Sequence, residues 1–104
     1  MSRTVPGHIV SLNGAKFSAV FIIDEIQYTF AGNINPNPGK FHVDKAVLAY
    51  DHTDQLTATR SFTGQVGIEA ITFTIENGPV IQGTLDDVVD PVITVSGTGT
   101  WTTA

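Results

Sequence analysis

The feature that most constrains this chain is a period of two in the segment Lys16–Asn33. Apolar side chains occupy every second position on both sides of the dipeptide Asp24-Glu25: Phe17, Ala19, Phe21 and Ile23 before it, and Ile26, Tyr28 and Phe30 after it. Successive side chains of a β-strand point to opposite faces, so this spacing is typical of strands with one buried face. The segment therefore predicts two neighbouring strands.

The same residues predict a hairpin register. If Ile23 pairs with Ile26, Phe21 lies opposite Tyr28, and the large aromatic side chains share one face. Asp24-Glu25 is a poor two-residue hairpin turn, because such turns need positive φ angles and favour Asn-Gly. We therefore expect a longer loop here, with looser strand pairing near its tip.

The same alternation recurs along the rest of the chain, between turn residues such as Asn77-Gly78. Further strands are expected at His8–Leu12, Lys40–Tyr50, Leu56–Val66, Ile68–Ile75, Val80–Leu85 and Val92–Thr102. No segment has the spacing of an amphipathic helix. We predict an all-β fold of about eight antiparallel strands, forming a small barrel or sandwich in a single domain that spans residues 1–104.

One expected strand, Lys40–Tyr50, changes phase in its middle. Phe41 and Val43 share one parity, whereas Ala46, Leu48 and Tyr50 share the other. A β-bulge adds one residue to a strand and so reverses the parity of all later residues in that strand. The sequence therefore predicts a bulge near Asp44-Lys45.

Composition excludes several functions. The chain has 5 Lys and Arg against 10 Asp and Glu, a net charge of −5, and so lacks the basic patch that nucleic-acid binding requires. It has no cysteine, which excludes disulfides and thiolate metal sites. No transmembrane segment is expected, because the longest apolar run is Ala19–Ile23. The first residues do not resemble a secretory leader, and cytoplasmic and secreted locations both stay open.

Three polar segments are the candidate contact regions, because binding residues concentrate on loops of a rigid scaffold. They are the loop Asn33–Gly39, the turn Asp51–Asp54 and an acidic loop Asp86–Pro91. Their candidate binding residues are Asn35, Asn37, Asp51, His52, Asp54, Asp86, Asp87 and Asp90. A cation at His52 and Asp54, or at the acidic loop, is the less favoured alternative to a solvated turn. We predict no bound metal and no cofactor.

Arg60 is a further candidate binding residue, because it shares a face with Leu56 and Phe62. A charge on an apolar face must find a partner or reach water. Arg60 is therefore expected to pair with Asp44 or Glu69, to cap one end of a barrel, or to bind an anionic ligand.

The run Gly39–Leu56 (GKFHVDKAVLAYDHTDQL) and the ending Val92–Trp101 (VITVSGTGTW) resemble the virulence-associated surface proteins of intracellular actinobacteria. Those proteins have a small eight-stranded barrel, a Thr-Asp-Asp-Leu-type turn and a Gly-rich end before Trp. Here Thr53-Asp54-Gln55-Leu56 occupies the place of the turn, with Gln55 in place of the second Asp, and the Gly-rich end is shorter. The resemblance implies a non-enzymatic, exported, compact barrel and carries over no catalytic residue.

No catalytic set is recognisable, because the chain lacks cysteine and a Gly-x-Ser-x-Gly motif. We predict a non-catalytic binding or protein-interaction module whose partner is a protein or a carbohydrate; Phe41, Tyr50 and Trp101 are candidates for stacking on sugar rings. The first alternative is a small barrel hydrolase or isomerase that uses Asp44, Glu69 and Arg60. The second is a structural subunit of a homo-oligomer that packs through strand edges or a Thr-lined face.

Overall fold

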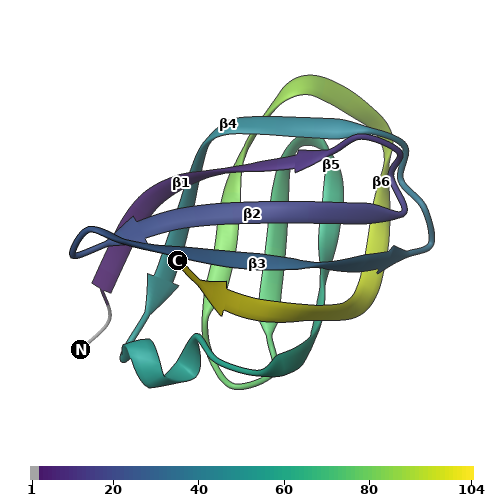
Figure 1. Cartoon of the computed structure of the whole chain (residues 1–104). Helices are drawn as coiled ribbons and strands as arrows, with labels where there is room; N and C mark the ends of the chain where they lie inside the picture. Colours follow the sequence, from purple (N-terminus) through teal and green to yellow (C-terminus); the bar gives the residue numbers. More distant parts are fainter. Residues whose placement is uncertain (1–2) are drawn as a thin grey trace.

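The predicted alternation forms six antiparallel strands in the computed structural model, which describes residues 3–104 (Figure 1). The strands are β1 (Arg3–Ser11), β2 (Lys16–Ile23), β3 (Ile26–Asn35), β4 (Phe41–Tyr50), β5 (Thr59–Ile75) and β6 (Val80–Thr103), with one 3-10 turn, η1 (Thr53–Gln55). The all-β fold class is confirmed. Within these residues no helix has the length and apolar character needed to cross a bilayer.

β5 and β6 are long because each bends and uses its two halves separately. Thr59–Val66 pairs with Ile93–Thr100, whereas Ala70–Thr74 pairs with Val80–Thr84. This bending explains why the sequence suggests about eight short strands where the structure has six longer ones.

The two halves of β5 also face each other. The backbone amide of Glu76 donates to the carbonyl oxygen of Ser61 at 3.0 Å. A Cβ atom added to Gly64 would collide with the carbonyl oxygen of Thr72, so this close approach requires glycine.

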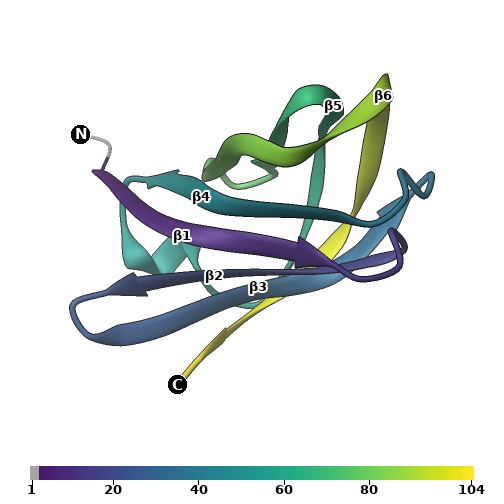
Figure 2. The same cartoon turned by 90° about the horizontal axis from the view of Figure 1, so that it is seen from above.

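The sheet closes on itself. Its strand order is β3-β2-β1-β4-β6-β5, and a further pairing of β3 with β6 joins Tyr28–Asn35 to Ser96–Thr103. Figures 1 and 2 show β1–β4 as one layer, with β5 and the bent β6 lying across its back. Closure removes most of the open edges that a sheet of this size would otherwise present to solvent.

The hairpin of β2 and β3 has the predicted register, with Ile23 opposite Ile26 and Phe21 opposite Tyr28. The expectation of a longer loop is wrong, because Asp24 and Glu25 alone form the turn, with φ angles of 50° and 69°. Asp tolerates this left-handed region better than most residues do. The closely matched flanking strands hold Glu25 in the same region despite its low preference for it.

Aromatic side chains fill the interior. Phe17, Phe30, Phe62 and Phe73 form five ring contacts with centroids 4.7–6.0 Å apart, and Phe30 also lies 4.8 Å from Trp101. All five side chains are at least 95% buried. The barrel therefore has a packed core at this level, and ligands have to be sought on its outside.

We expect Phe73→Ala to lower the free energy of unfolding by about 3–5 kcal/mol, because it removes a buried ring and leaves a cavity. Ile22→Ala is the control: Ile22 is 60% exposed, and its replacement should change stability by no more than about 0.5 kcal/mol. Urea unfolding followed by Trp101 fluorescence measures both values. Similar losses in the two variants would contradict a tightly packed interior.

Candidate functional site

A bulge in β4 turns neighbouring polar side chains outward. Between its pairings of Val43 and Ala46 with β1, β4 has one residue more than β1. Asp44 and Lys45, the residues within the bulge, are both exposed, as the sequence predicts. His42, two residues before Asp44, is also exposed, so His42 and Asp44 share the outer face of β4.

On the N-terminal side of the bulge, β4 and β6 diverge. Their ladder joins Ala46–Ala49 to Val80–Gly83 and extends no further. On its other edge β6 pairs with β5 at Thr84 and next at Val89, because the register shifts between these pairings. Within residues 3–104, Leu85–Val88 therefore have no ladder partner. Figure 2 shows this part of β6, in light green, rising away from β4.

Side chains connect the two strands where the backbone ladder has ended. His42 lies between two carboxylates: its Nε2 is 2.8 Å from Oδ1 of Asp44, and its Nδ1 is 2.9 Å from Oδ2 of Asp86. The side chains of His42, Asp44 and Asp86 are 50%, 65% and 35% exposed. Because they are so exposed, these pairs contribute only about 0–1 kcal/mol to stability.

A groove of about 510 Å³ lies next to this cluster and includes His42 in its wall. The end of β1, the start of β4 and the diverging part of β6 supply its other side chains, among them Val10, Leu12, Lys40, Phe41, Asp87 and Val88. Leu12 is 86% exposed and Val88 is 61% exposed. Apolar side chains at the wall of a concave surface are typical of binding sites.

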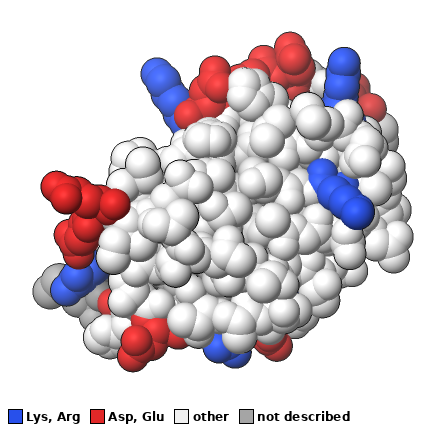
Figure 3. Space-filling view, in the orientation of Figure 1, with Lys and Arg blue, Asp and Glu red and all other residues white. Residues whose placement is uncertain are grey.

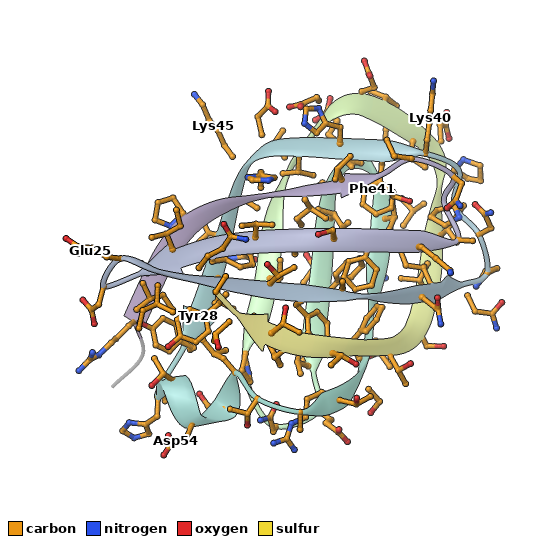
Figure 4. The ribbon with its side chains drawn as sticks, in the orientation of Figure 1. Glu25, Tyr28, Lys40, Phe41, Lys45 and Asp54 are labelled. Carbon is orange, nitrogen blue, oxygen red and sulfur yellow. The ribbon has the colours of Figure 1, made fainter. Side chains whose placement is uncertain are left out.

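Charge is concentrated at the same edge of the molecule. Figure 3 shows acidic side chains along the top of the view, over β4 and the first part of β6, with basic side chains on either side. Figure 4 labels Lys40 and Lys45 at these flanking positions. Lys40 and Asp87 both line the groove, and neither forms an ion pair within residues 3–104.

The prediction of an acidic loop at Asp86–Pro91 is wrong, because β6 continues through this segment. Val88, Val89 and Val92 supply the strand preference there. A proline is tolerated because this stretch lies next to unpaired strand backbone. Of the predicted residues, Asp86 contacts His42 and Asp87 lines the groove, whereas Asp90 does neither.

The loop predicted at Asn33–Gly39 begins later than expected, because β3 continues to Asn35, which pairs with Ser96. The side chain of Asn37 joins two loops: its Nδ2 donates to the carbonyl oxygen of Asn13 at 3.0 Å, and its Oδ1 accepts from the amide of Gly39 at 2.7 Å. Asn37 therefore positions the chain that leads into the groove and does not line it.

Asp51, His52 and Asp54 lie elsewhere. Figure 4 labels Asp54 at the bottom of the view, far from Lys40 and Phe41. Oε1 of Gln55 accepts hydrogen bonds from the amides of Asp51 and His52 at 2.8 and 3.2 Å. These interactions fix the turn in place.

Gln55 also connects this turn to the one before β6. Its Nε2 donates to the carbonyl oxygen of Asn77 at 2.9 Å, and Nδ2 of Asn77 donates to the carbonyl oxygen of Gln55 at 2.9 Å. Gln55 is the residue that departs from the Thr-Asp-Asp-Leu pattern. Its amide supplies a donor that an Asp carboxylate lacks.

Arg60 is half-buried on the same face of β5 as Phe62, as predicted. Its Nε donates to the carbonyl oxygen of Thr57 at 3.0 Å. It forms no ion pair with Asp44, Glu69 or any other carboxylate of residues 3–104. Arg60 therefore interacts with the segment just before its own strand and does not line the groove.

Only Asp87 of the eight groove residues was among the predicted binding residues. The seven others were not among them: Val10, Ser11, Leu12, Lys40, Phe41, His42 and Val88. The two-residue spacing of His42 and Asp44 predicts that both lie on the outer face of β4. Their approach to Asp86 could not be predicted, because it depends on how far apart β4 and β6 lie.

Comparisons of the chain with protein-family models, curated proteins and solved structures give no match. Function is therefore inferred from the groove and its neighbouring cluster.

Gln55→Glu should lower the free energy of unfolding by about 1–3 kcal/mol, because it places a carboxylate oxygen against the carbonyl of Asn77. The same change at Gln27, an exposed residue of β3, is the control and should alter stability by no more than about 0.5 kcal/mol. Urea unfolding measures both. Faster amide exchange confined to the η1 turn would support the assignment, and equal effects at both sites would refute it.

Proposed function

We propose that this protein is a non-catalytic binding module that holds an extended polypeptide segment in the groove between β1, β4 and β6. The observation that carries the proposal is the coincidence of unpaired strand backbone at Leu85–Val88 with exposed apolar side chains at Leu12 and Val88. An extended peptide can add to an open strand edge through backbone hydrogen bonds, while side-chain pockets give specificity.

Apolar contact favours such a segment. Burying a Leu or Val side chain is worth about 1.5–3 kcal/mol, before the costs of association are subtracted. Leu12 and Val88 are the two most exposed large hydrophobic residues of the described chain, and both line this groove. A partner that covers Leu12 and Val88 buries these two apolar side chains away from water.

The charges of the groove specify the segment further. Lys40 and Asp87 line it without ion-pair partners among the described residues. A complementary segment carries apolar side chains together with one acidic and one basic residue that can reach these two charges. Such complementary charges increase specificity and association rate more than affinity.

A polypeptide partner is favoured over a carbohydrate. The aromatic residues considered for stacking on sugars, Phe41, Tyr50 and Trp101, are only 4–5% exposed. Although Phe41 lines the groove, all three rings are packed in the core and too deeply buried to stack flat on a sugar.

The enzyme alternative has less support. Asp44 contacts His42, and Arg60 donates to the carbonyl of Thr57. Asp44, Arg60 and Glu69 line neither the groove nor three other depressions on the described part of the chain. A hydrolase or isomerase needs its acid, base and substrate-orienting groups to converge on one cavity.

The homo-oligomer alternative has one specific observation in its favour. The outward side chains of β1, β2, β3 and β6 form two cross-strand rows without Asp, Glu, Lys or Arg: Val10, Ser18, Ala31 and Thr100, and His8, Val20, Thr29 and Thr102. Figure 3 shows this largely uncharged face toward the viewer. Protein interfaces are depleted of charged residues at their centres, so this face suits a second copy of the chain.

A displayed library of random peptides tests the groove. Selection on the immobilised chain should enrich extended sequences in which apolar residues alternate with charged ones. A synthetic peptide from the selection should shift the backbone NMR signals of Leu12, Lys40–His42 and Asp87-Val88. Leu12→Ser and Val88→Ser should each weaken its binding about tenfold, the loss expected from one apolar contact.

Ile22→Ser is the matched control, because Ile22 is also an exposed apolar strand residue but lies outside the groove. It should leave the affinity unchanged. The proposal fails if no peptide is enriched, if the shifts map to Asp51–Asp54, or if Ile22→Ser weakens binding as much as Val88→Ser does.

Sedimentation velocity tests the oligomer alternative. If the uncharged face joins two copies, the sedimentation coefficient should rise with concentration, and Val20→Lys should keep the chain monomeric by placing a charge at the centre of the interface. Thr63→Lys, at an exposed position of β5, is the control and should leave association unchanged. A wild-type chain that stays monomeric throughout would exclude this alternative.

A further inference from the structure

Three residues with metal-ligating atoms meet where β4 and β6 diverge. His42 and Asp44 come from the outer face of β4, and Asp86 comes from β6. One candidate ligand atom from each residue lies within 4.8 Å of the other two. Small rotations of exposed side chains can therefore bring a nitrogen and two carboxylate oxygens to a common ion.

His42 lies between two carboxylates, an arrangement of groups that can hold a cation. Both ring nitrogens lie next to carboxylate oxygens, at 2.8 and 2.9 Å. A neutral imidazole has one N–H, so the lone pair of its other nitrogen then faces a carboxylate. A metal ion placed among the three groups can accept that lone pair, and the two carboxylates balance its charge.

The donor set indicates the class of ion. Imidazole nitrogen suits Zn²⁺, Ni²⁺ and Cu²⁺, whereas Ca²⁺ and Mg²⁺ prefer sites made only of oxygen ligands. Zinc accepts both imidazole and carboxylate ligands, at about 2.0–2.2 Å. Three protein ligands leave at least one coordination position for water.

We propose that His42, Asp44 and Asp86 form a site for one divalent transition-metal ion of the Zn²⁺ class. The ion connects β4 to β6 beyond their last ladder pair, Ala46 and Gly83. It therefore stabilises the folded chain and fixes the position of the unpaired stretch of β6. The evidence for this site is the ligand cluster and does not depend on the proposed peptide binding, although His42 also lines the groove.

The test uses the untagged full chain, freed of metal by a chelator and then titrated with zinc chloride. Calorimetry should show one site per chain, and the melting temperature should rise with zinc concentration. In the wild-type protein, zinc should shift the ring-nitrogen NMR signals of His42 and leave those of His8 and His52 in place. Calcium chloride at the same concentrations should produce neither effect.

Variants separate this site from adventitious binding. Asp44→Asn and Asp86→Asn keep the side-chain shape but remove a ligand charge, and each should weaken zinc binding at least about tenfold. His42→Gln should abolish it. His52→Gln and Asp54→Asn, a His and an Asp two residues apart on the opposite side of the molecule, are the matched controls and should bind as wild type does.

Circular dichroism checks that each variant remains folded, and the wild-type NMR titration needs no variant. The proposal is overturned by an absence of saturable zinc binding, by shifts at His8 or His52 in place of His42, or by wild-type affinity in either Asn variant of the cluster.

Discussion

Closure of the sheet around a set of aromatic rings is the constraint on which the rest of the structure depends. The rings come from four different strands: Phe17, Phe30, Phe62, Phe73 and Trp101. Their contacts bring the two halves of β5 together and hold β6 against β3. Because interiors of this kind are packed as densely as organic crystals, the scaffold is rigid and recognition is left to its outer surface.

The sequence predicts the class of fold well. The period of two lies within each strand, so it can be recognised without knowing which strands pair. The register of the β2–β3 hairpin and the bulge at Asp44-Lys45 could both be read from side-chain parity. Two errors share a cause. Asp24-Glu25 and Asp86–Pro91 have poor local preferences for the structures they adopt, and their flanking strands override those preferences.

The candidate site was harder to predict, because its residues meet only through the arrangement of strands in space. Asp86 and Asp87 were found from their charge, but Asp51, His52 and Asp54 were chosen by the same reasoning and lie far from the groove. The pairing of His42 with Asp86 depends on the angle at which β4 leaves β6, and no spacing within the sequence encodes that angle. Exposure of Leu12 and Val88 is likewise a property of the folded surface.

The bulge in β4 makes the length of this strand as important as its composition. Removing a single residue between Val43 and Ala46 would restore an uninterrupted ladder to β1, yet it would invert every side chain on one side of the deletion. Phe41 would then face water and His42 would face the aromatic interior. The chain can therefore accept many substitutions at Asp44 and Lys45, but a shortened version loses its groove and its core contacts together.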